Sequence, residues 1–427
     1  MDTIFALATA PGKAGVSVIR ISGPAAEAAG RALCGELPKP RIASLRKLRN
    51  HDGALIDEAL VLFFEAGRSF TGEAVVEFQV HGSQAVIAAV LHCLSSIEGL
   101  RHADAGEFTR RALENGVLDL TQVEALSDLI EAETEAQRKQ ATDVLSGALG
   151  ALVGNWRRDV IRAASLLEAT IDFSDEDVPV DVSDEVRDLI SGVRDQIDRQ
   201  LSGLDAAERV RSGFEVAIVG SPNVGKSTLL NYLAGRDAAI TSEVAGTTRD
   251  VIEVRMDISG YAVTLIDTAG LRETEDVVEL IGVDRAKARA DLADVRVHLI
   301  DADETPYLDV RSTDIVLVGK CDEGGYVGGI SGKTGLGTAE FLDRLTGILH
   351  GLTAGAGVAS RVRHRIVLEN GISNLNQALQ LLAGGPEVYD IVSEEIRTAA
   401  RGMSALLGYV DVEHLLDEIF SSFCVGK

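Results

Sequence analysis

Three things are scarce in this chain of 427 residues: cysteine, long apolar runs and positive charge. The cysteines Cys34, Cys93, Cys321 and Cys424 are widely scattered, which argues against a disulfide scaffold or a zinc cluster. No apolar run approaches the roughly 18 residues that a membrane-spanning helix needs. Residues 1–5 carry no basic region ahead of an apolar stretch. We therefore expect a cytoplasmic protein with no membrane partner.

Basic residues are outnumbered, because 41 lysines and arginines stand against 66 aspartates and glutamates, for a formal net charge of −25. Most of the surface must therefore repel nucleic acid, and an RNA partner would need a local basic patch, whose place the sequence does not reveal. The composition, with 46% hydrophobic and 25% charged residues, is that of a globular protein. The length exceeds what one hydrophobic core organises, so we expect two or three domains.

The most informative segment is residues 220–227, which read Gly-Ser-Pro-Asn-Val-Gly-Lys-Ser, the pattern of a phosphate-binding P-loop. Its glycines let backbone N–H groups converge on phosphate oxygens, Lys226 reaches the terminal phosphates, and Ser227 ligates magnesium. The apolar run 215–219 before it predicts a buried strand, and the residues after it predict a helix that Gly235 can cap. The chain is therefore expected to bind a nucleoside triphosphate.

Two later segments have the order and spacing that GTP-binding proteins require. The first, residues 246–250, places Thr248 where it can complete the magnesium shell while the γ-phosphate is present and leave it after hydrolysis. Arg249 in this segment, like Lys226, is a candidate catalytic residue. The second, residues 267–270, reads Asp-Thr-Ala-Gly after a predicted strand; its aspartate holds magnesium through water and its glycine N–H senses the γ-phosphate.

A third segment, residues 319–322, reads Gly-Lys-Cys-Asp after an apolar run and predicts the site that recognises the base. Asp322 can accept hydrogen bonds from guanine N1–H and N2–H, whereas adenine presents an acceptor there. Residues 331–333, Ser-Gly-Lys, would close over the base. GTPases usually begin this motif with asparagine, so Gly319 predicts looser guanine specificity. The alternative interpretation is a plain strand followed by a turn.

The expected GTP-binding residues are Gly220, Asn223, Val224, Gly225, Lys226, Ser227, Thr228, Asp267, Thr268, Ala269, Gly270, Lys320, Asp322, Ser331, Gly332 and Lys333. The residue that positions the attacking water is less plain, because Leu271 stands where small GTPases carry glutamine. Acidic residues are numerous between 272 and 279, and the pattern does not choose among them. Asn223 is either a turn residue or a ligand of a monovalent cation beside the phosphates.

Other segments resemble the MnmE/TrmE type of tRNA modification GTPase over nearly the whole chain. The matching segments are 9–23, 69–73, 80–82, 105–110, 118–125 and the C-terminal Phe-Cys-Val-Gly-Lys of 423–427. The resemblance implies an N-terminal domain that dimerises and binds a tetrahydrofolate one-carbon carrier, and a GTPase inserted into a helical domain. It also implies that GTP hydrolysis drives motion of the GTPase domain, and that C5 of the wobble uridine in tRNA is modified together with an FAD-containing partner.

The resemblance also assigns roles to individual residues around the nucleotide. Potassium would be held near Asn223, Ser242, Val244 and Thr247, would promote dimerisation of the GTPase domains, and would take the place of an arginine finger. Glu279 would orient the water. A fixed cation beside the β/γ oxygens stabilises the charge that develops there, which makes this assignment physically reasonable.

For the folate, the resemblance points to Arg20, Glu77 and Lys427, while Val117 stands where the family has a lysine and so puts one contact in doubt. A carboxylate can hold the amino-pyrimidine edge of a pterin, and a basic group can pair with a glutamate tail. Each residue taken singly is more often a member of a surface ion pair. Cys424 matches the family's C-terminal cysteine and is a candidate catalytic residue, although a buried inert thiol is equally compatible.

The expected fold is therefore multidomain. We expect an α+β domain for tetrahydrofolate and dimerisation at 1–118, an α-helical bundle formed by 119–212 and 353–427, and an inserted α/β P-loop GTPase domain at 213–352. Residues 351–357, rich in glycine, predict a flexible junction, and helical periodicity resumes at Arg361.

Two rival functions share part of this pattern. A GTPase of ribosome assembly, or a regulatory switch without modification chemistry, would share every motif between 213 and 335 but would have no use for the N-terminal and C-terminal motifs. A folate-binding scaffold with a decayed GTPase is suggested only by Gly319. Binding of tetrahydrofolate by the chain would distinguish the modification enzyme from the first rival, which has no folate site. Potassium-stimulated GTP hydrolysis would exclude the second rival, whose GTPase is inactive.

Overall fold

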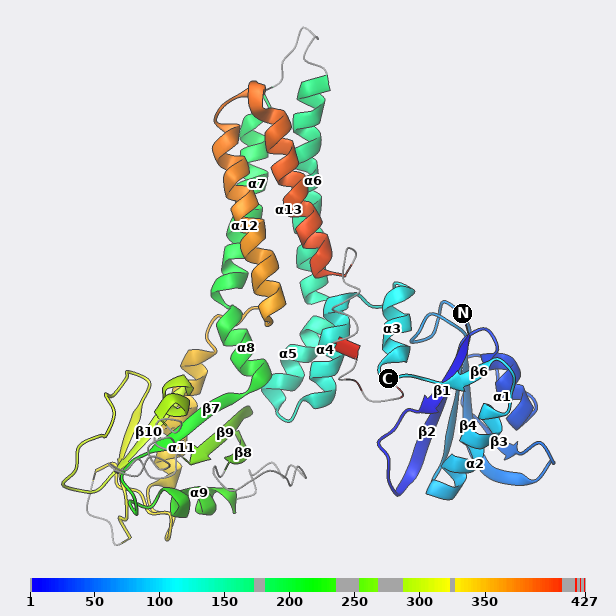
Figure 1. The fold of residues 1–427 in the computed structure, drawn as a ribbon, viewed down its shortest axis with the longest axis horizontal. Helices are drawn as coiled ribbons and strands as arrows, with labels where there is room; N and C mark the ends of the chain where they lie inside the picture. Colours follow the sequence, from blue (N-terminus) through cyan, green and yellow to red (C-terminus); the bar gives the residue numbers. More distant parts are fainter. Residues whose placement is uncertain are drawn as a thin grey trace, which may run out of the picture. The chain divides into compact units, whose positions relative to one another are not determined.

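The computed structural model describes residues 2–172, 181–235, 253–267, 287–322, 327–408 and the positions 419, 420, 423 and 426. Its contacts divide the chain into two compact units, residues 1–127 with 404–427, and residues 128–403 (Figure 1). The C-terminal residues thus cluster with the N-terminal ones in the first unit. No helix in the described ranges is long and apolar enough to cross a membrane.

The first unit is built on one mixed sheet of the order β3-β4-β5-β2-β1-β6, in which β1 and β6 are parallel and the other pairs antiparallel. The strands are β1 Thr3–Leu7, β2 Ala14–Ser22, β3 Ser44–Arg49, β4 Leu55–Phe64, β5 Val75–Gly82 and β6 Leu100–His102. The helices α1 Ala26–Cys34 and α2 Gln84–Ser95 pack on the sheet. This confirms the predicted α+β character.

Alternation along the strands separates two faces of this sheet. In β5, Val76, Phe78 and Val80 are buried in the core together with residues of α1 and α2, whereas Glu77 and Gln79 between them are only partly buried. Successive residues of a strand point to opposite faces, so the helices cover one face and leave Glu77 on the other.

Two more helices, α3 Glu107–Glu114 and α4 Leu120–Glu131, follow the sheet. Val123 of α4 forms a small buried cluster with Phe420 and Phe423. Near the C-terminus the structure describes positions 419, 420, 423 and 426, and of these Phe420 and Phe423 are buried apolar side chains.

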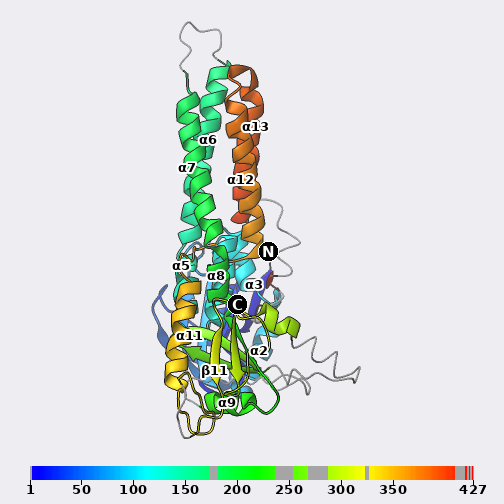
Figure 2. The same ribbon diagram turned by 90° about the vertical axis from the view of Figure 1, so that its left-hand side faces the viewer.

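The second unit contains long helices that lie side by side, as Figures 1 and 2 show for α6, α7, α12 and α13. The helices are α5 Glu135–Leu145, α6 Ala148–Asp172, α7 Ser183–Ser202, α8 Leu204–Ser212, α12 Val362–Leu382, the short 3₁₀ turn Pro386–Val388 and α13 Tyr389–Leu406. Helices α6 and α12 both pack on α7. Because α7 precedes the GTPase segment and α12 follows it, that segment is an insertion, as predicted.

The inserted segment forms a second sheet of the order β11-β10-β7-β9-β8, parallel except for the β8–β9 hairpin. Its strands are β7 Phe214–Val219, β8 Glu253–Ile258, β9 Tyr261–Asp267, β10 Val295–Ile300 and β11 Ile315–Val318, and its helices include α9 Lys226–Ala234 and α11 Thr338–Leu352. The apolar residues of α9 and α11 share one core with the sheet. The strands predicted before the P-loop and before residues 267–270 are present as β7 and β9, and the apolar run before residues 319–322 forms β11.

The glycine-rich junction differs from the expectation. Helix α11 continues to Leu352, so its first two residues are helical, and the rest is packed rather than free. A Cβ on Gly203 would lie 2.2 Å from the carbonyl oxygen of Gly355, and Gly357 N–H donates to the carbonyl of Gly203. The junction is therefore packed against Gly203, the residue between α7 and α8, and glycine on both sides allows the two backbones to approach closely.

Candidate functional site

The P-loop joins the carboxyl end of β7 to the start of α9, the place where a parallel sheet presents its ligand sites. Glycine is required at its first position, because a Cβ on Gly220 would lie 2.1 Å from the carbonyl oxygen of Leu299 in β10. At its end Gly225 has φ 110°, a left-handed conformation that starts α9 and leaves that helix's first N–H groups facing the loop.

Lys226 closes the loop on itself. Its ammonium donates hydrogen bonds to the carbonyl oxygens of Gly220 at 2.8 Å and Ser221 at 2.9 Å, and the residue is 6% exposed. Burial lowers the pKa of Lys226, and the nearby Asp267 carboxylate opposes that shift. A buried ammonium that donates hydrogen bonds to neutral carbonyls gains from an anion placed in the loop.

Ser227 and Asp267 meet at the end of β9. The hydroxyl of Ser227 donates a 2.6 Å hydrogen bond to Oδ2 of Asp267, whose other carboxylate oxygen, Oδ1, is buried without a partner among the described residues. A buried carboxylate oxygen left unpaired is costly, and a hard cation beside it would remove that cost. The hydroxyl and carboxylate therefore fit the magnesium ion that the sequence predicted there.

A pocket of about 370 Å³ is found elsewhere, in the first unit, but a smaller one of about 220 Å³ lies beside the P-loop. The smaller pocket brings together residues predicted from three separate segments. They are Asn223, Val224, Gly225 and Thr228 of the P-loop and α9, Gly319, Lys320 and Asp322 after β11, and Gly332 and Lys333, together with the unpredicted Leu229, Leu299 and Ile330.

Asp322 is oriented from the Ser-Gly-Lys segment. The buried hydroxyl of Ser331 donates a 2.6 Å hydrogen bond to Oδ1 of Asp322, and Lys333 Nζ lies 3.9 Å from Oδ2. The same Ser331 oxygen accepts from the backbone N–H groups of Lys333 and Thr334, which fixes the turn. A carboxylate held in one orientation at the edge of an apolar pocket can accept hydrogen bonds from two neighbouring N–H groups of a flat base.

Gly319, the departure from the usual base-recognition motif, has a steric reason. A Cβ at this position would lie 2.6 Å from the carbonyl oxygen of Val224 in the P-loop and 3.3 Å from Cγ of Leu299. The P-loop therefore rests directly on the chain after β11. The rival interpretation, a plain strand and turn, does not explain this contact with the phosphate loop.

Asn223 lies at the exposed mouth of the P-loop with φ 62°, a left-handed conformation that asparagine tolerates better than most residues. The turn interpretation is therefore confirmed, and its role as a cation ligand stays a prediction. The other predicted residues Ser242, Val244, Thr247, Thr248, Arg249, Thr268, Ala269, Gly270, Glu279, Cys424 and Lys427 lie outside the described residues.

A second cluster lies on the sheet of the first unit, where Arg20 and Glu77 are direct partners across β2 and β5. Arg20 Nε donates to Oε1 of Glu77 at 2.8 Å, and the guanidinium lies 5.4 Å from the Phe70 ring centroid and 5.6 Å from that of Phe108. The structure thus brings the two predicted folate residues together. Val117, at the position of the family's lysine, is 43% exposed.

Sequence reasoning missed residues that the fold brings to the P-loop from β10. The Ser221 hydroxyl donates to Glu304 at 2.7 Å, and Lys320 Nζ pairs with Asp301 at 3.3 Å. Asp301 directly follows β10, and Glu304 lies three residues further along the chain. Acidic residues just after the carboxyl end of a parallel strand were the signal that could have found them.

Two family models match the chain. The model described as GTP-binding protein TrmE N-terminus matches residues 3–117, and the model described as MnmE helical domain matches residues 120–424.

The chain is also similar to complete relatives. A protein of Roseobacter denitrificans named tRNA modification GTPase MnmE is 56% identical over 428 residues, with 100% of both chains covered. A Ruegeria pomeroyi protein of the same name is 55% identical over the same length, also with 100% of both covered. Among solved structures, Aquifex aeolicus Era bound to GDP and AlF4− is 30% identical, covers 32% of this chain and 56% of its own, and has a TM-score of 0.26.

Proposed function

The chain belongs to the MnmE family of tRNA modification GTPases, and from this membership we propose that it uses GTP hydrolysis to modify C5 of the wobble uridine in tRNA. The observation that carries the GTPase part is one pocket lined by both the P-loop and Asp322. This cavity combines a loop that can bind phosphates with a carboxylate that can accept hydrogen bonds from the edge of a purine. That combination fits a guanine nucleotide.

In this site the chain's own groups divide the work. The P-loop N–H groups and Lys226 bind the phosphates, and Asp322, held by Ser331, orients the base. Ser227, Asp267 and Thr248 would hold magnesium, which neutralises charge on the β/γ oxygens.

For hydrolysis we assign the orientation of water to Glu279 and the stabilisation of charge to potassium near Asn223, Ser242, Val244 and Thr247. The position of Asn223 at the mouth of the P-loop supports this assignment. A GTPase assay in which sodium replaces potassium tests it, with hydrolysis expected to fall while GTP binding persists. Equal rates in the two salts would remove potassium from the mechanism.

We assign tetrahydrofolate to the first unit, with Arg20 and Glu77 as its ligands and Lys427 and Cys424 at the C-terminus as further candidates. The ion pair of Arg20 and Glu77, flanked by Phe70 and Phe108, supports the assignment, since aromatic walls and a carboxylate suit a flat heterocycle with N–H donors. Calorimetric titration with 5-formyltetrahydrofolate tests it, and a flat titration would favour the regulatory-switch function.

The partners that complete the proposal are a second copy of the chain, an FAD-containing modification protein and tRNA. The whole function is tested in cells in which the Lys226→Ala form replaces the native chain. The wobble uridines should lose their C5 substituent by nucleoside mass spectrometry. A ribosome-assembly GTPase would instead leave the nucleosides unchanged and alter the ribosome profile.

A further inference from the structure

The pocket of about 370 Å³ in the first unit is lined by more than the predicted folate residues. Its walls are Arg41, Phe64, Gly67, Arg68, Ser69, Phe70, Val75 and Glu77. Its volume lies in the range of about 300–1,000 Å³ typical of small-molecule sites. Only Glu77 of this set was expected to bind a ligand.

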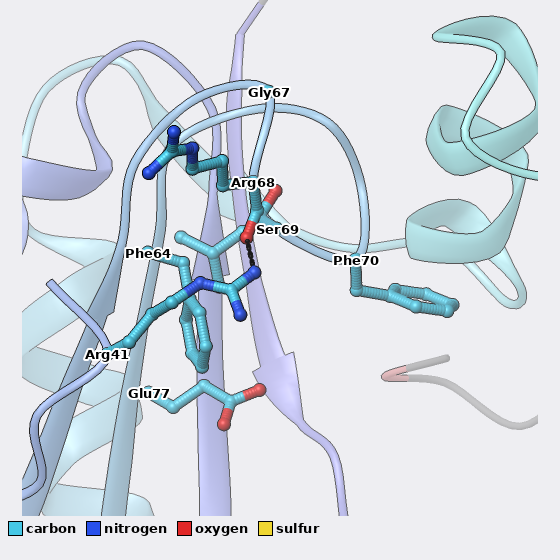
Figure 3. A pocket seen from close by; sticks show the side chains of 8 residues that line it. Arg41, Phe64, Gly67, Arg68, Ser69, Phe70 and Glu77 are labelled. Atoms are coloured by element: carbon cyan, nitrogen blue, oxygen red, sulfur yellow. Dashed lines mark hydrogen bonds between the residues drawn. The ribbon is translucent and has the colours of Figure 1, made fainter.

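The pocket lies over the ends of β4 and β5. Phe64 pairs with Val75, and Leu62 with Glu77, across these strands. Arg20 is the cross-strand partner of Glu77 on the other side, so the pocket is continuous with the Arg20–Glu77 pair. In Figure 3, the guanidinium of Arg41 lies between Arg68 above it and Glu77 below it, with the Phe64 ring beside it, and the Arg68 side chain extends away from Glu77.

Arg41 is held in place by the main chain. Its φ is 62°, an unusual left-handed conformation for arginine, and its N–H donates to the carbonyl of Phe63 at 2.8 Å. Its guanidinium donates to the carbonyl of Arg68 at 2.7 Å and lies 6.0 Å from the Phe64 ring centroid. These contacts fix the guanidinium inside the pocket and leave further N–H donors for a ligand.

Arg41 and Arg68 have no carboxylate partner among the residues that the structure describes. Within the described part of the first unit neither forms an ion pair, whereas Arg20 pairs with Glu77 and Arg111 with Glu73 and Glu107. Two uncompensated guanidinium groups at one pocket stand out in a chain of net charge −25. Guanidinium groups bind carboxylates through paired N–H donors, so the pocket offers a site for a dianion.

We infer that Arg41 and Arg68 form a subsite for the glutamate tail of the folate whose ring the Arg20–Glu77 pair holds. The inference rests on the proposed folate site and adds to it the recognition of the tail. The ring lies at Glu77, the benzoyl group packs on Phe64, and the tail carboxylates take the two guanidinium groups. Because a longer tail carries more carboxylates, the pocket favours folates with several glutamates.

The test compares ligands that share a ring and differ in the tail: 5-formyltetrahydropteroate without glutamate, 5-formyltetrahydrofolate with one, and its triglutamate. The full chain should bind the glutamate forms roughly tenfold to a hundredfold more tightly than the tailless one, the effect of one or two charge-assisted hydrogen bonds. This preference should shrink in high salt, because the tail subsite opens to solvent.

The Arg41→Gln/Arg68→Gln variant should bind the tailless ligand as the native chain does and lose the preference for glutamate. The matched control is Arg46→Gln/Arg49→Gln, which removes the same charge from arginines that also bond backbone carbonyls but do not line the pocket. It should keep the preference.

The outcomes separate the two proposals. If the double variant keeps the glutamate preference, the tail subsite is wrong and the folate site stands. If the native chain binds none of the ligands, the folate function itself fails. Should the double variant lose even the tailless ligand, the single variant Arg68→Gln decides the question, since the Arg68 side chain makes no described hydrogen bond that holds the fold. A reduced glutamate preference in Arg68→Gln supports the subsite, and an unchanged preference overturns it.

Discussion

The hydroxyl of Ser331 donates a 2.6 Å hydrogen bond to Oδ1 of Asp322 across nine positions of sequence, and this bond fixes the carboxylate that faces the base pocket. Ser331 is fully buried, so its hydroxyl has no water to exchange with. The orientation of Asp322 is therefore built into the fold before a nucleotide arrives.

Ser331→Ala should weaken GTP binding about tenfold and leave ATP binding nearly unchanged. The reason is that a hydrogen bond to a charged group contributes about 1.5–3 kcal/mol and that, in our proposal, guanine but not adenine donates to the Asp322 carboxylate. Competition titrations with a fluorescent GTP analogue measure both affinities. Thr334→Ala, in the same loop, is the control; an equal loss for ATP and GTP would show a general collapse of the loop.

Gly319→Ala should reduce nucleotide affinity rather than improve guanine selectivity. The new Cβ would meet the carbonyl of Val224 at 2.6 Å, so the P-loop must shift, at a cost of about 1–3 kcal/mol. Gly347→Ala, where nothing lies within 4 Å of the added atom, is the matched control and should bind normally. Unchanged GTP affinity in Gly319→Ala would show that the loop tolerates a side chain there.

Lys226→Ala should abolish triphosphate binding, since we propose that its ammonium, held in the P-loop by the carbonyl of Gly220, binds the phosphates. Isothermal titration with a non-hydrolysable GTP analogue measures this, with the exposed Lys287→Ala as a control of equal charge. Normal affinity in the first variant would refute the P-loop assignment.

Ser227→Ala should remove the dependence of nucleotide binding on magnesium. In the native chain the affinity should rise when magnesium replaces EDTA, because in our proposal Ser227 and Asp267 would hold the cation beside the phosphates. Titrations of the native chain and of Ser227→Ala with a GTP analogue, each with and without magnesium, measure this dependence. A variant that responds to magnesium as the native chain does would place the ion elsewhere.

Asp314→Asn should destabilise the GTPase domain by about 3–5 kcal/mol, because Arg296 at 2.7 Å loses a buried partner. Burial alone would raise the pKa of Asp314, but hydrogen bonds from Arg296, the Arg311 N–H and His298 hold it below its ordinary value of 3.8. A carboxyl with a depressed pKa stabilises the fold above 3.8 and loses that effect as the pH falls further.

The difference in unfolding midpoint between the native chain and Asp314→Asn should therefore be full at pH 7 and narrow progressively below pH 3.8. Urea denaturation followed across this range measures it, with the exposed Asp303→Asn as control. A difference that stays constant down to pH 2 would mean that the charge of Asp314 contributes nothing.

The sequence by itself determined the parts whose chemistry is local. The glycine and lysine spacing of 220–227 predicts a P-loop because those backbone angles and that ammonium must stand next to one another in the chain, and β7 and α9 flank it as expected. The apolar runs at β9 and β11 were found for the same reason, since a buried parallel strand is nearly uniformly apolar.

Only the tertiary structure decided which distant groups meet. It explains Gly319 by the carbonyl of Val224, brings Glu304 to Ser221, and turns a predicted flexible junction into a packed contact at Gly203. It also places Arg41 and Arg68 in one pocket with Glu77. Contacts between segments far apart in the chain depend on the order of strands in the sheet and on the course of the loops. A local sequence pattern contains no information about either.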